Sequence, residues 1–341
     1  MSLLWIDGFE TYTTSAGTNI TTILGARYTT SGTITSAASS YGGLCVTSAP
    51  NAYLQTPALT TNATLAAGFR FMGTAVVGMG AASIVQFYDG STLGFDVQWN
   101  PYSQELSVYR GGTLLGTTSG AGITTGVWYH IDVQVLCSAT VGTVTVQVAG
   151  VTVLALTGQN TKAGSDSFHN MVRFCLGNWG LATYFDAVYV LDGNGTVNNS
   201  ILGPCNIVAA LLPAGDSSVQ WSTSAGTTHY SLVDEVPPDG DMTWVSSATS
   251  GQLDLFTYTS PAYPSATILG IQLTTTCRVT DANTFGLYAV VYSGSENDGT
   301  PQTISSTTYA DYRRIVETDP NTGAAWTIAG LSAAKFGVKV Q

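Results

Sequence analysis

Apolar and polar residues alternate with a period of two along most of this chain, and this pattern limits its fold more than any other feature. The alternation is clearest at 95–99 (FDVQW), 131–135 (IDVQV) and 144–148 (VTVQV). Neighbouring side chains of a β-strand point to opposite faces of a sheet, so a period of two predicts strands with one buried and one solvated face. Such half-buried strands are typical of antiparallel sheets.

Short glycine-containing segments separate the predicted strands. Three of them are 88–91 (YDGS), 110–113 (RGGT) and 148–151 (VAGV). Glycine adopts the positive φ that a tight hairpin turn needs, so these segments predict hairpins. Strands that recur at intervals of roughly eight to twelve residues are typical of a β-sandwich or jelly roll.

Helices are disfavoured in nearly every window because β-branched residues and glycine are so frequent. The exception is 323–336, where alanine-rich helix formers follow a turn at 319–323. We expect a short helical turn near 323–334 and a final strand at 336–340.

The length of the chain, 341 residues, exceeds the size at which a single hydrophobic core usually stops growing, so we expect two domains. A polar run rich in glycine and asparagine at 193–200 follows the predicted strand 184–191 and indicates the boundary. The fold class that these observations predict is all-β, with two β-sandwich, jelly-roll-like domains in tandem. The first domain is expected over 1–195 and the C-terminal sandwich over 205–341.

Charged residues make up only 9% of the chain, whereas an ordinary globular chain has about 25%. The net charge is −11, and the ten Lys and Arg residues form no basic stripe that could neutralise phosphates. The adjacent Arg313 and Arg314 are expected to form local salt bridges with Asp311 and Glu317. The longest apolar run, 75–88, is interrupted by glycine and polar residues. We therefore expect neither nucleic acid nor a membrane as a partner.

The cysteines are odd in number, widely spaced and without a CxxC motif, so they predict neither a zinc site nor a dense disulfide framework. They are Cys45, Cys137, Cys175, Cys205 and Cys277. Most are expected to be buried thiols that act as small hydrophobes, with one bridge between distant strands left open. The N-terminal segment 1–7 lacks the basic start and long apolar core of a secretory signal.

Three motifs in the first part of the chain carry a family resemblance. They are LWIDGFETY at 4–12, GVWYHI at 126–131, which precedes a predicted hairpin at 143–156, and YFDAVYVLD at 184–192. Over about the first 195 residues the chain resembles the laminin-G-like, concanavalin A-like jelly rolls of bacteriophage virion structural proteins.

The second part, through DEVPPD at 234–239 and ETDPNTGAAWT at 317–327, is similar to the C-terminal region of phage and prophage virion proteins. The resemblance implies a non-enzymatic structural component of a phage particle, located in the virion as a head decoration, tail or fibre protein, that contacts other virion proteins. Broad, weakly charged sheet faces and unprotected edge strands further predict a homo-oligomer. The alternative is a receptor- or glycan-binding adhesion module of the virion that recognises a cell-surface glycan.

Relatives of the resembled family that bind sugar or calcium place carboxylates on loops at one rim of the sandwich. By position alone, the candidates here are Asp89, Asp186 and Asp192. The chain lacks the alternating Asp and Asn of a tight calcium loop. We therefore expect solvated turn or strand-end acids, no metal and no cofactor.

Exposed aromatic rings could stack on sugars, and Trp99, Tyr102, Tyr109 and Trp179 fall in or near predicted loops. Core packing is the stronger expectation for Trp99 and for Trp128, because both alternate with apolar neighbours and buried aromatics dominate sandwich cores.

No catalytic residues are predicted. His130 and Asp132 share one face of a strand, but no Gly-x-Ser-x-Gly elbow accompanies them, so a surface hydrogen bond or none is expected. His169 and His229 are isolated in the sequence and are assigned no role.

The acidic residues do not indicate an enzyme either. Glu105 is the only acid between Asp96 and Asp132, so the paired carboxylates of a glycoside hydrolase are missing from this region. The acidic turn at 234–241 is expected to be an exposed loop, with docking of a basic partner or a cation as the alternative.

Overall fold

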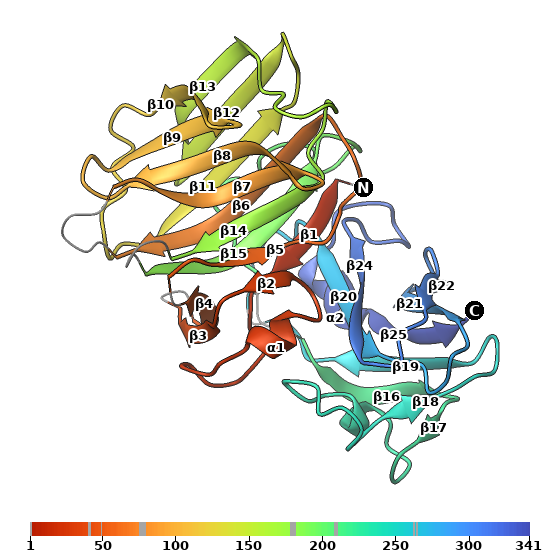
Figure 1. Ribbon diagram of the computed structural model, residues 1–341. Helices are drawn as coiled ribbons and strands as arrows, with labels where there is room; N and C mark the ends of the chain where they lie inside the picture. The colour runs from red at the N-terminus through yellow and green to blue at the C-terminus, as the bar shows by residue number, and fades with distance from the viewer. Residues whose placement is uncertain are drawn as a thin grey trace. The chain divides into compact units, whose positions relative to one another are not determined.

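The computed structural model describes residues 2–39, 42–48, 50–74, 80–177, 182–207, 211–261, 263 and 265–341. The chain forms two compact units, Met1–Ile207 and Val208–Gln341. Both units are built from antiparallel sheets, as the alternation predicts, and the fold is all-β with β-sandwich, jelly-roll-like domains (Figure 1). Among the described residues, no helix has the length and apolar character needed to cross a membrane.

The first unit contains two large antiparallel sheets. The eight-stranded sheet has the order β13-β12-β11-β6-β15-β4-β3, with β1 also paired to β15. Its strands are β1 (Leu3–Asp7), β3 (Ile34–Ala38), β4 (Leu44–Ser48), β6 (Thr64–Gly73), β11 (Tyr129–Leu136), β12 (Gly142–Val148), β13 (Val151–Gln159) and β15 (Thr183–Asp192).

The seven-stranded sheet of this unit has the order β10-β9-β8-β7-β14-β5-β2. Its strands are β2 (Thr29–Ser31), β5 (Ala52–Gln55), β7 (Ala82–Asp89), β8 (Thr92–Asn100), β9 (Glu105–Arg110), β10 (Thr113–Thr117) and β14 (Met171–Leu176). Neighbours in both sheets come from distant parts of the sequence, so hairpins alone do not define the topology.

Three predicted hairpins are confirmed. They join β7 to β8, β9 to β10 and β12 to β13. Their turns contain Gly90, Gly112 and Gly150 with φ of 55°, 86° and 81°. These left-handed conformations favour glycine, which explains why the turns could be recognised in the sequence.

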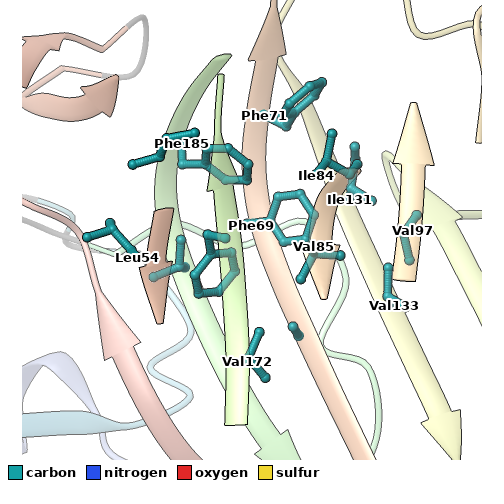
Figure 2. Packing of buried hydrophobic residues seen from close by; sticks show 14 of the residues in the cluster. Leu54, Phe69, Phe71, Ile84, Val85, Val97, Ile131, Val133, Val172 and Phe185 are labelled. Carbon is teal, nitrogen blue, oxygen red and sulfur yellow. The ribbon is translucent and has the colours of Figure 1, made fainter. Parts of the chain in front are cut away.

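The core of the first unit lies between its two sheets. Figure 2 shows Phe69 and Phe71 of β6 among buried residues of both sheets. The ring centroid of Phe69 lies 5.7 Å from that of Phe174 on β14, and that of Phe71 lies 5.3 Å from that of Trp99 on β8. Because alternate residues of a strand face opposite sides, the residues between these core positions lie on the outer faces of the sheets.

A four-residue helix in the first unit was not predicted. The helix α1 covers Thr21–Leu24. Three of its four residues, two Thr and one Ile, have only modest helix propensity. Asn19 Oδ1 accepts a hydrogen bond from Thr21 N at 3.1 Å, and Leu24 is fully buried in the core. Tertiary burial therefore overrides local propensity here.

Residues 201–207, part of which were expected to belong to an inter-domain boundary, form part of the first unit. Leu202 N donates to Tyr189 OH at 3.0 Å, and Arg70 Nε donates to the carbonyl of Cys205 at 3.3 Å. Arg70 lies between the core residues Phe69 and Phe71, so it is on the outer face of the eight-stranded sheet. The segment therefore packs on that face.

The second unit has one six-stranded sheet and a two-stranded sheet, together with the short strand pair β17 and β18. The six-stranded sheet has the order β16-β19-β25-β21-β22, with β23 also paired to β21, and the two-stranded sheet is β20-β24. Its elements are β16 (Pro213–Val219), β17 (Ser222–Thr223), η1 (Tyr230–Leu232), β18 (Val245–Ser246), β19 (Leu253–Tyr258), β20 (Ile271–Cys277), β21 (Phe285–Ser293), β22 (Ser295–Asn297), β23 (Gln302–Ile304), β24 (Ala310–Val316), α2 (Ile328–Ala333) and β25 (Lys335–Val340).

The core of the second unit lies between the six-stranded sheet and the β20-β24 sheet. Val291 and Phe336 of the large sheet pack with Val316 of β24 and with Trp326. The helix α2 lies inside the range expected for a helical turn, and Thr327 Oγ1 caps it by accepting from Gly330 N at 2.9 Å. This core is smaller than that of the first unit.

Candidate functional site: the outer face of the seven-stranded sheet

Polar and aromatic side chains form a line across the outer face of the seven-stranded sheet. On β8, Phe95 and Val97 point into the core, so Asp96 between them points outward. The pairing register places six outward residues side by side on β2, β5, β14, β7, β8 and β9. We call them the transverse row: Thr29, Gln55, Arg173, Gln86, Asp96 and Tyr109. Strands in a sheet lie about 4.8 Å apart, so the row extends over about 24 Å.

Arg173 is held firmly in this row. Its guanidinium carbon lies 4.0 Å from the ring centroid of Tyr53 and 4.3 Å from that of Tyr88. Its Nε and Nη2 donate to Gln55 Oε1 at 3.0 and 2.7 Å. Two cation–π contacts and two hydrogen bonds to one amide oxygen restrict the orientation of the guanidinium. Hydrogen bonds from Nη1 to other described side chains or carbonyls are absent.

Asp96 is the one carboxylate in the transverse row, and it is only 6% exposed. Its Oδ2 accepts from Gln98 Nε2 at 2.7 Å and from Ser83 Oγ at 3.0 Å. Its Oδ1 is buried and has no hydrogen-bond partner among the described residues. Burial raises the pKa of this carboxyl, and interactions with Gln98, Ser83 and Gln86 partly oppose the rise. A buried acceptor without a partner is uncommon in native proteins and indicates a place for a donor from outside.

Tyr88 connects the arginine stack to the carboxylate group. Its hydroxyl donates to Gln86 Oε1 at 2.9 Å, and Gln86 Nε2 donates to Ser83 Oγ at 3.3 Å. Ser83 in turn bonds to Asp96. A continuous chain of contacts therefore runs from Arg173 to Asp96. Because these contacts already restrict the side chains, a ligand that binds here loses less free energy to side-chain ordering.

Two of the three acids predicted at the rim, Asp186 and Asp192, have hydrogen-bond partners within the protein. Asp186 and Asp192 are 2% and 3% exposed, so the expectation that they are solvated is wrong. Asp186 Oδ1 accepts from the backbone N of Ala187 at 2.7 Å, and Asp192 Oδ1 accepts from that of Asn194 at 3.0 Å. These local backbone donors explain their burial. Asp89 ends β7 and is half-buried. Across the described ranges, no group of three or more His, Cys, Asp or Glu could hold a metal ion.

The predicted aromatic residues divide between core and surface. Trp99 is fully buried, which confirms core packing. Trp128 is only half-buried and lies outside the core cluster, contrary to expectation. It directly precedes β11, in line with the alternate residues of that strand that point away from the core. Tyr109 belongs to the transverse row, and Tyr102 is 55% exposed in a turn. Trp179 lies outside the described residues.

The predicted pair of His130 and Asp132 is present but buried. His130 Nε2 lies 3.0 Å from Asp132 Oδ1, and Tyr189 OH donates to the same oxygen at 2.5 Å. The residues are 6%, 0% and 1% exposed, so this is not the surface hydrogen bond that was expected. The reason is the segment 201–207, whose Leu202 N bonds to Tyr189 on the same face.

The other two histidines also have defined environments. His229 is not isolated, because its Nδ1 lies 2.6 Å from Asp254 Oδ2 in the second unit. His169 is 1% exposed, and burial lowers its pKa to about 4. It is therefore a neutral, buried ring, and neither histidine is part of the transverse row.

All five cysteines are free, so the disulfide left open by the sequence does not form. Cys45 and Cys137 are buried and the others are half-buried. Burial raises the thiol pKa to about 11 at Cys137 and to about 12 at Cys45, Cys205 and Cys277. These thiols are therefore poor nucleophiles.

In the second unit, Arg314 and the acidic turn at 234–241 have partners that the sequence did not predict. Arg314 Nη1 donates to the carbonyls of Ala289 and Asn297 at 2.6 and 2.8 Å instead of pairing with the acids near it in sequence. β24 places its side chain toward these carbonyls. In the acidic turn, Thr243 Oγ1 donates to Asp239 Oδ2, and Asp241 forms a salt bridge with Arg278, both at 2.8 Å.

Sequence reasoning missed the transverse row. The alternation at 95–99 correctly placed Asp96 on a polar face, but it gave no partner for that face. Gln55 and Arg173 are neighbours only because β5 pairs with β14 across more than a hundred residues of sequence. The available signal was weak: outward positions of several strands carry Gln, Arg, Asp and Tyr instead of Thr and Ser.

Comparison with known proteins gives fold-level similarities only. No family model matches the sequence, and no curated protein matches it either. Among solved structures, alginate lyase Aly36B matches with 14% identity over 55% of this chain and 96% of that chain, at a TM-score of 0.35.

Two further matches are carbohydrate-binding domains. Domain 4 of AbnA, a GH43 extracellular arabinanase from Geobacillus stearothermophilus solved with arabinotriose, is 13% identical over 57% of this chain and 94% of that domain, with a TM-score of 0.37. The lectin UEA-II complexed with galactose is 12% identical over 55% of this chain and 98% of that lectin, with a TM-score of 0.34.

Proposed function

We propose that this protein is a glycan-binding adhesion module and that the transverse row is its binding face. The observation that carries the proposal is the buried, unpartnered Oδ1 of Asp96 within a row of arginine, glutamine and tyrosine side chains. Sugar hydroxyl groups donate and accept hydrogen bonds, and the C–H faces of sugar rings pack on aromatic side chains. The row offers both kinds of contact on a surface fixed by its own hydrogen bonds.

The other polar group of the first unit is less suited to a ligand. His130, Asp132 and Tyr189 are buried beneath residues 201–207, whose backbone bonds to Tyr189. A ligand would first have to displace that segment. Of the rim acids, Asp186 and Asp192 accept hydrogen bonds at both carboxylate oxygens, so these oxygens already have partners.

The test is binding of the full chain to a glycan array, followed by affinity electrophoresis in gels that contain the polysaccharides found. The variant Asp96→Asn keeps an oxygen for Ser83 and Gln98 but replaces the unpartnered acceptor with an NH₂ donor. Loss of a hydrogen bond to a charged group costs about 1.5–3 kcal/mol, so we expect binding to weaken about tenfold or more.

The matched control is Tyr102→Ala, which removes an exposed ring outside the row. It should leave binding unchanged. Binding that is lost in Tyr102→Ala and kept in Asp96→Asn would reject the transverse row as the site. An array without any dose-dependent signal would reject glycan binding itself.

The same samples address catalysis. A binding module leaves the polysaccharide intact, so we expect no release of new chain ends during incubation with the protein. Release that disappears in Asp96→Asn would instead show that the row belongs to an enzyme.

The sequence resemblance is the support for a location in a phage particle, where the module would be a structural or adhesive part in contact with other virion proteins. Antibody labelling of purified particles tests this prediction, and unlabelled particles would contradict it. Light scattering of the purified chain tests the predicted homo-oligomer, which a monomer at high concentration would exclude.

A further inference from the structure

We propose that the ligand of the transverse row is a linear polysaccharide that bears carboxylate groups, and that one of these groups pairs with the guanidinium of Arg173. This inference rests on the proposed glycan-binding function and names the chemical class of the glycan. It follows from the charge and the geometry of one residue.

Arg173 is the basic residue of the row. The strands of the seven-stranded sheet contain two arginines, Arg110 and Arg173, and no lysine. Arg173 lies between the core residues Val172 and Phe174, so it points outward. Arg110 is the last residue of β9 and lies on the same face of that strand as the core residues Leu106 and Val108. Its guanidinium donates to the carbonyl of Asn160.

The guanidinium of Arg173 has no carboxylate partner among the described residues. The guanidinium contacts two tyrosine rings and donates to the amide oxygen of Gln55. The chain has 21 acidic and 10 basic residues, so acidic partners are abundant in its composition. An arginine that is stacked, oriented and left without an anion in such a chain is arranged for an anion from outside.

The orientation of the guanidinium leaves a defined place for that anion. The two tyrosine rings lie against it, and Gln55 Oε1 occupies the edge formed by Nε and Nη2. The N–H groups of Nη1, with the second hydrogen of Nη2, form the remaining edge. A carboxylate can accept two parallel hydrogen bonds from such an edge, which gives both strength and direction.

The position of Asp96 is compatible with an acidic ligand. It lies two strands from Arg173 in the row, a separation of roughly 10 Å, which is about the Debye length at physiological salt. Burial raises the pKa of its carboxyl group above that of a solvent-exposed aspartate. The row therefore offers a cation for one sugar unit and a hydrogen-bonding carboxyl group for another, which fits a chain that crosses the strands.

The experiment compares polyuronates with their neutral counterparts. Full-length protein is titrated with polygalacturonate and with alginate, and then with the same polymers after chemical reduction of their carboxyl groups. We expect binding of at least one native polymer and at least tenfold weaker binding of its reduced form. Added salt should weaken binding of the native polymer because the ion pair is partly exposed.

Variants assign this preference to the arginine. Arg173→Gln should bind native and reduced polymers equally, and Arg173→Lys should keep part of the preference because it keeps the charge but loses the planar fork. Arg110→Gln is the matched control and should behave like the unmodified protein. Thermal unfolding of each variant confirms its fold, and the comparison of polymers on the unmodified protein stays decisive if Arg173→Gln does not fold.

Two failures are distinguishable. Equal binding of native and reduced polymers by the unmodified protein would overturn the carboxylate proposal and leave glycan binding in place. Preference for native polymer that persists in Arg173→Gln would also overturn it. Absence of binding to these polymers and to every glycan of the array would overturn both the inference and the proposed function.

Discussion

The two sheets of the first unit share one apolar core but differ in how they treat the polar residues on their outer faces. On the eight-stranded sheet, Asp132 is fully buried with His130 and Tyr189 beneath residues 201–207. On the seven-stranded sheet, Asp96 lies in a row whose other members are partly exposed. Both carboxylates have one oxygen without a partner in the part of the chain that the structure describes, namely Oδ2 of Asp132 and Oδ1 of Asp96. The two groups therefore differ in their surroundings, because residues 201–207 cover Asp132 whereas the neighbours of Asp96 in the row are partly exposed. This difference makes the first group structural and the second a candidate for binding.

The largest expected effect is on the covered face. Asp132→Ala removes the acceptor shared by His130 and Tyr189 and leaves both donors buried. Loss of a buried, charged hydrogen-bond partner should lower the free energy of unfolding by about 3 kcal/mol. Chemical denaturation measures the change. An effect below about 0.5 kcal/mol, the usual range of a surface substitution, would show that residues 201–207 do not bury Asp132 and its partners.

A change of opposite sign is expected on the open face. Asp96→Asn replaces a buried carboxylate by a neutral amide and so removes the cost of desolvating a charge, which should raise the free energy of unfolding by about 1 kcal/mol near neutral pH. The same variant is expected to bind glycan less well. Increased stability together with weaker binding would show that Asp96 contributes to ligand binding at a cost in stability. Reduced stability would mean that Asp96 stabilises the fold.

The stability gain of Asp96→Asn should depend on pH. The pKa of Asp96 is raised in the folded protein, so the folded state holds this proton more tightly than the unfolded chain does. The unmodified protein therefore loses stability as pH rises from about 3.9, the ordinary aspartate pKa, through the higher folded value. Asparagine does not titrate, so the gain should be greatest above the folded pKa and decline toward acid pH. Urea denaturation at several pH values measures this, and a gain that grows toward acid pH would contradict it.

The smallest expected effect is at the end of the transverse row. Tyr109→Ala removes an aromatic ring that can pack against a sugar, a contact of about 0.5–1.5 kcal/mol. Titration with the polysaccharide that the array identifies should show binding weakened a few-fold, with the exposed Tyr102→Ala as the unchanged control. Equal affinity for the two variants would place Tyr109 outside the binding face and shorten the site to the strands between Arg173 and Asp96.

Much of the fold could be predicted from local sequence. The alternation predicted the strands around Asp96 and Asp132, and glycine predicted the hairpins. The helix α1 could not be predicted, because it depends on burial of Leu24 in a core formed by distant strands. Arg314 shows the same limit, since its partners are carbonyls on β21 and β22 and not the acids near it in sequence.

By itself, the sequence determined which residues of each strand face a core and where the chain reverses, because these depend on side-chain period and on the φ that glycine allows. Only the tertiary structure decided which outward residues become neighbours and which of them stay open to solvent. Gln55 meets Arg173 through strand pairing, and residues 201–207 cover one sheet and not the other through backbone hydrogen bonds. Both outcomes depend on the register of strands that are far apart in the chain, and local patterns do not contain that register.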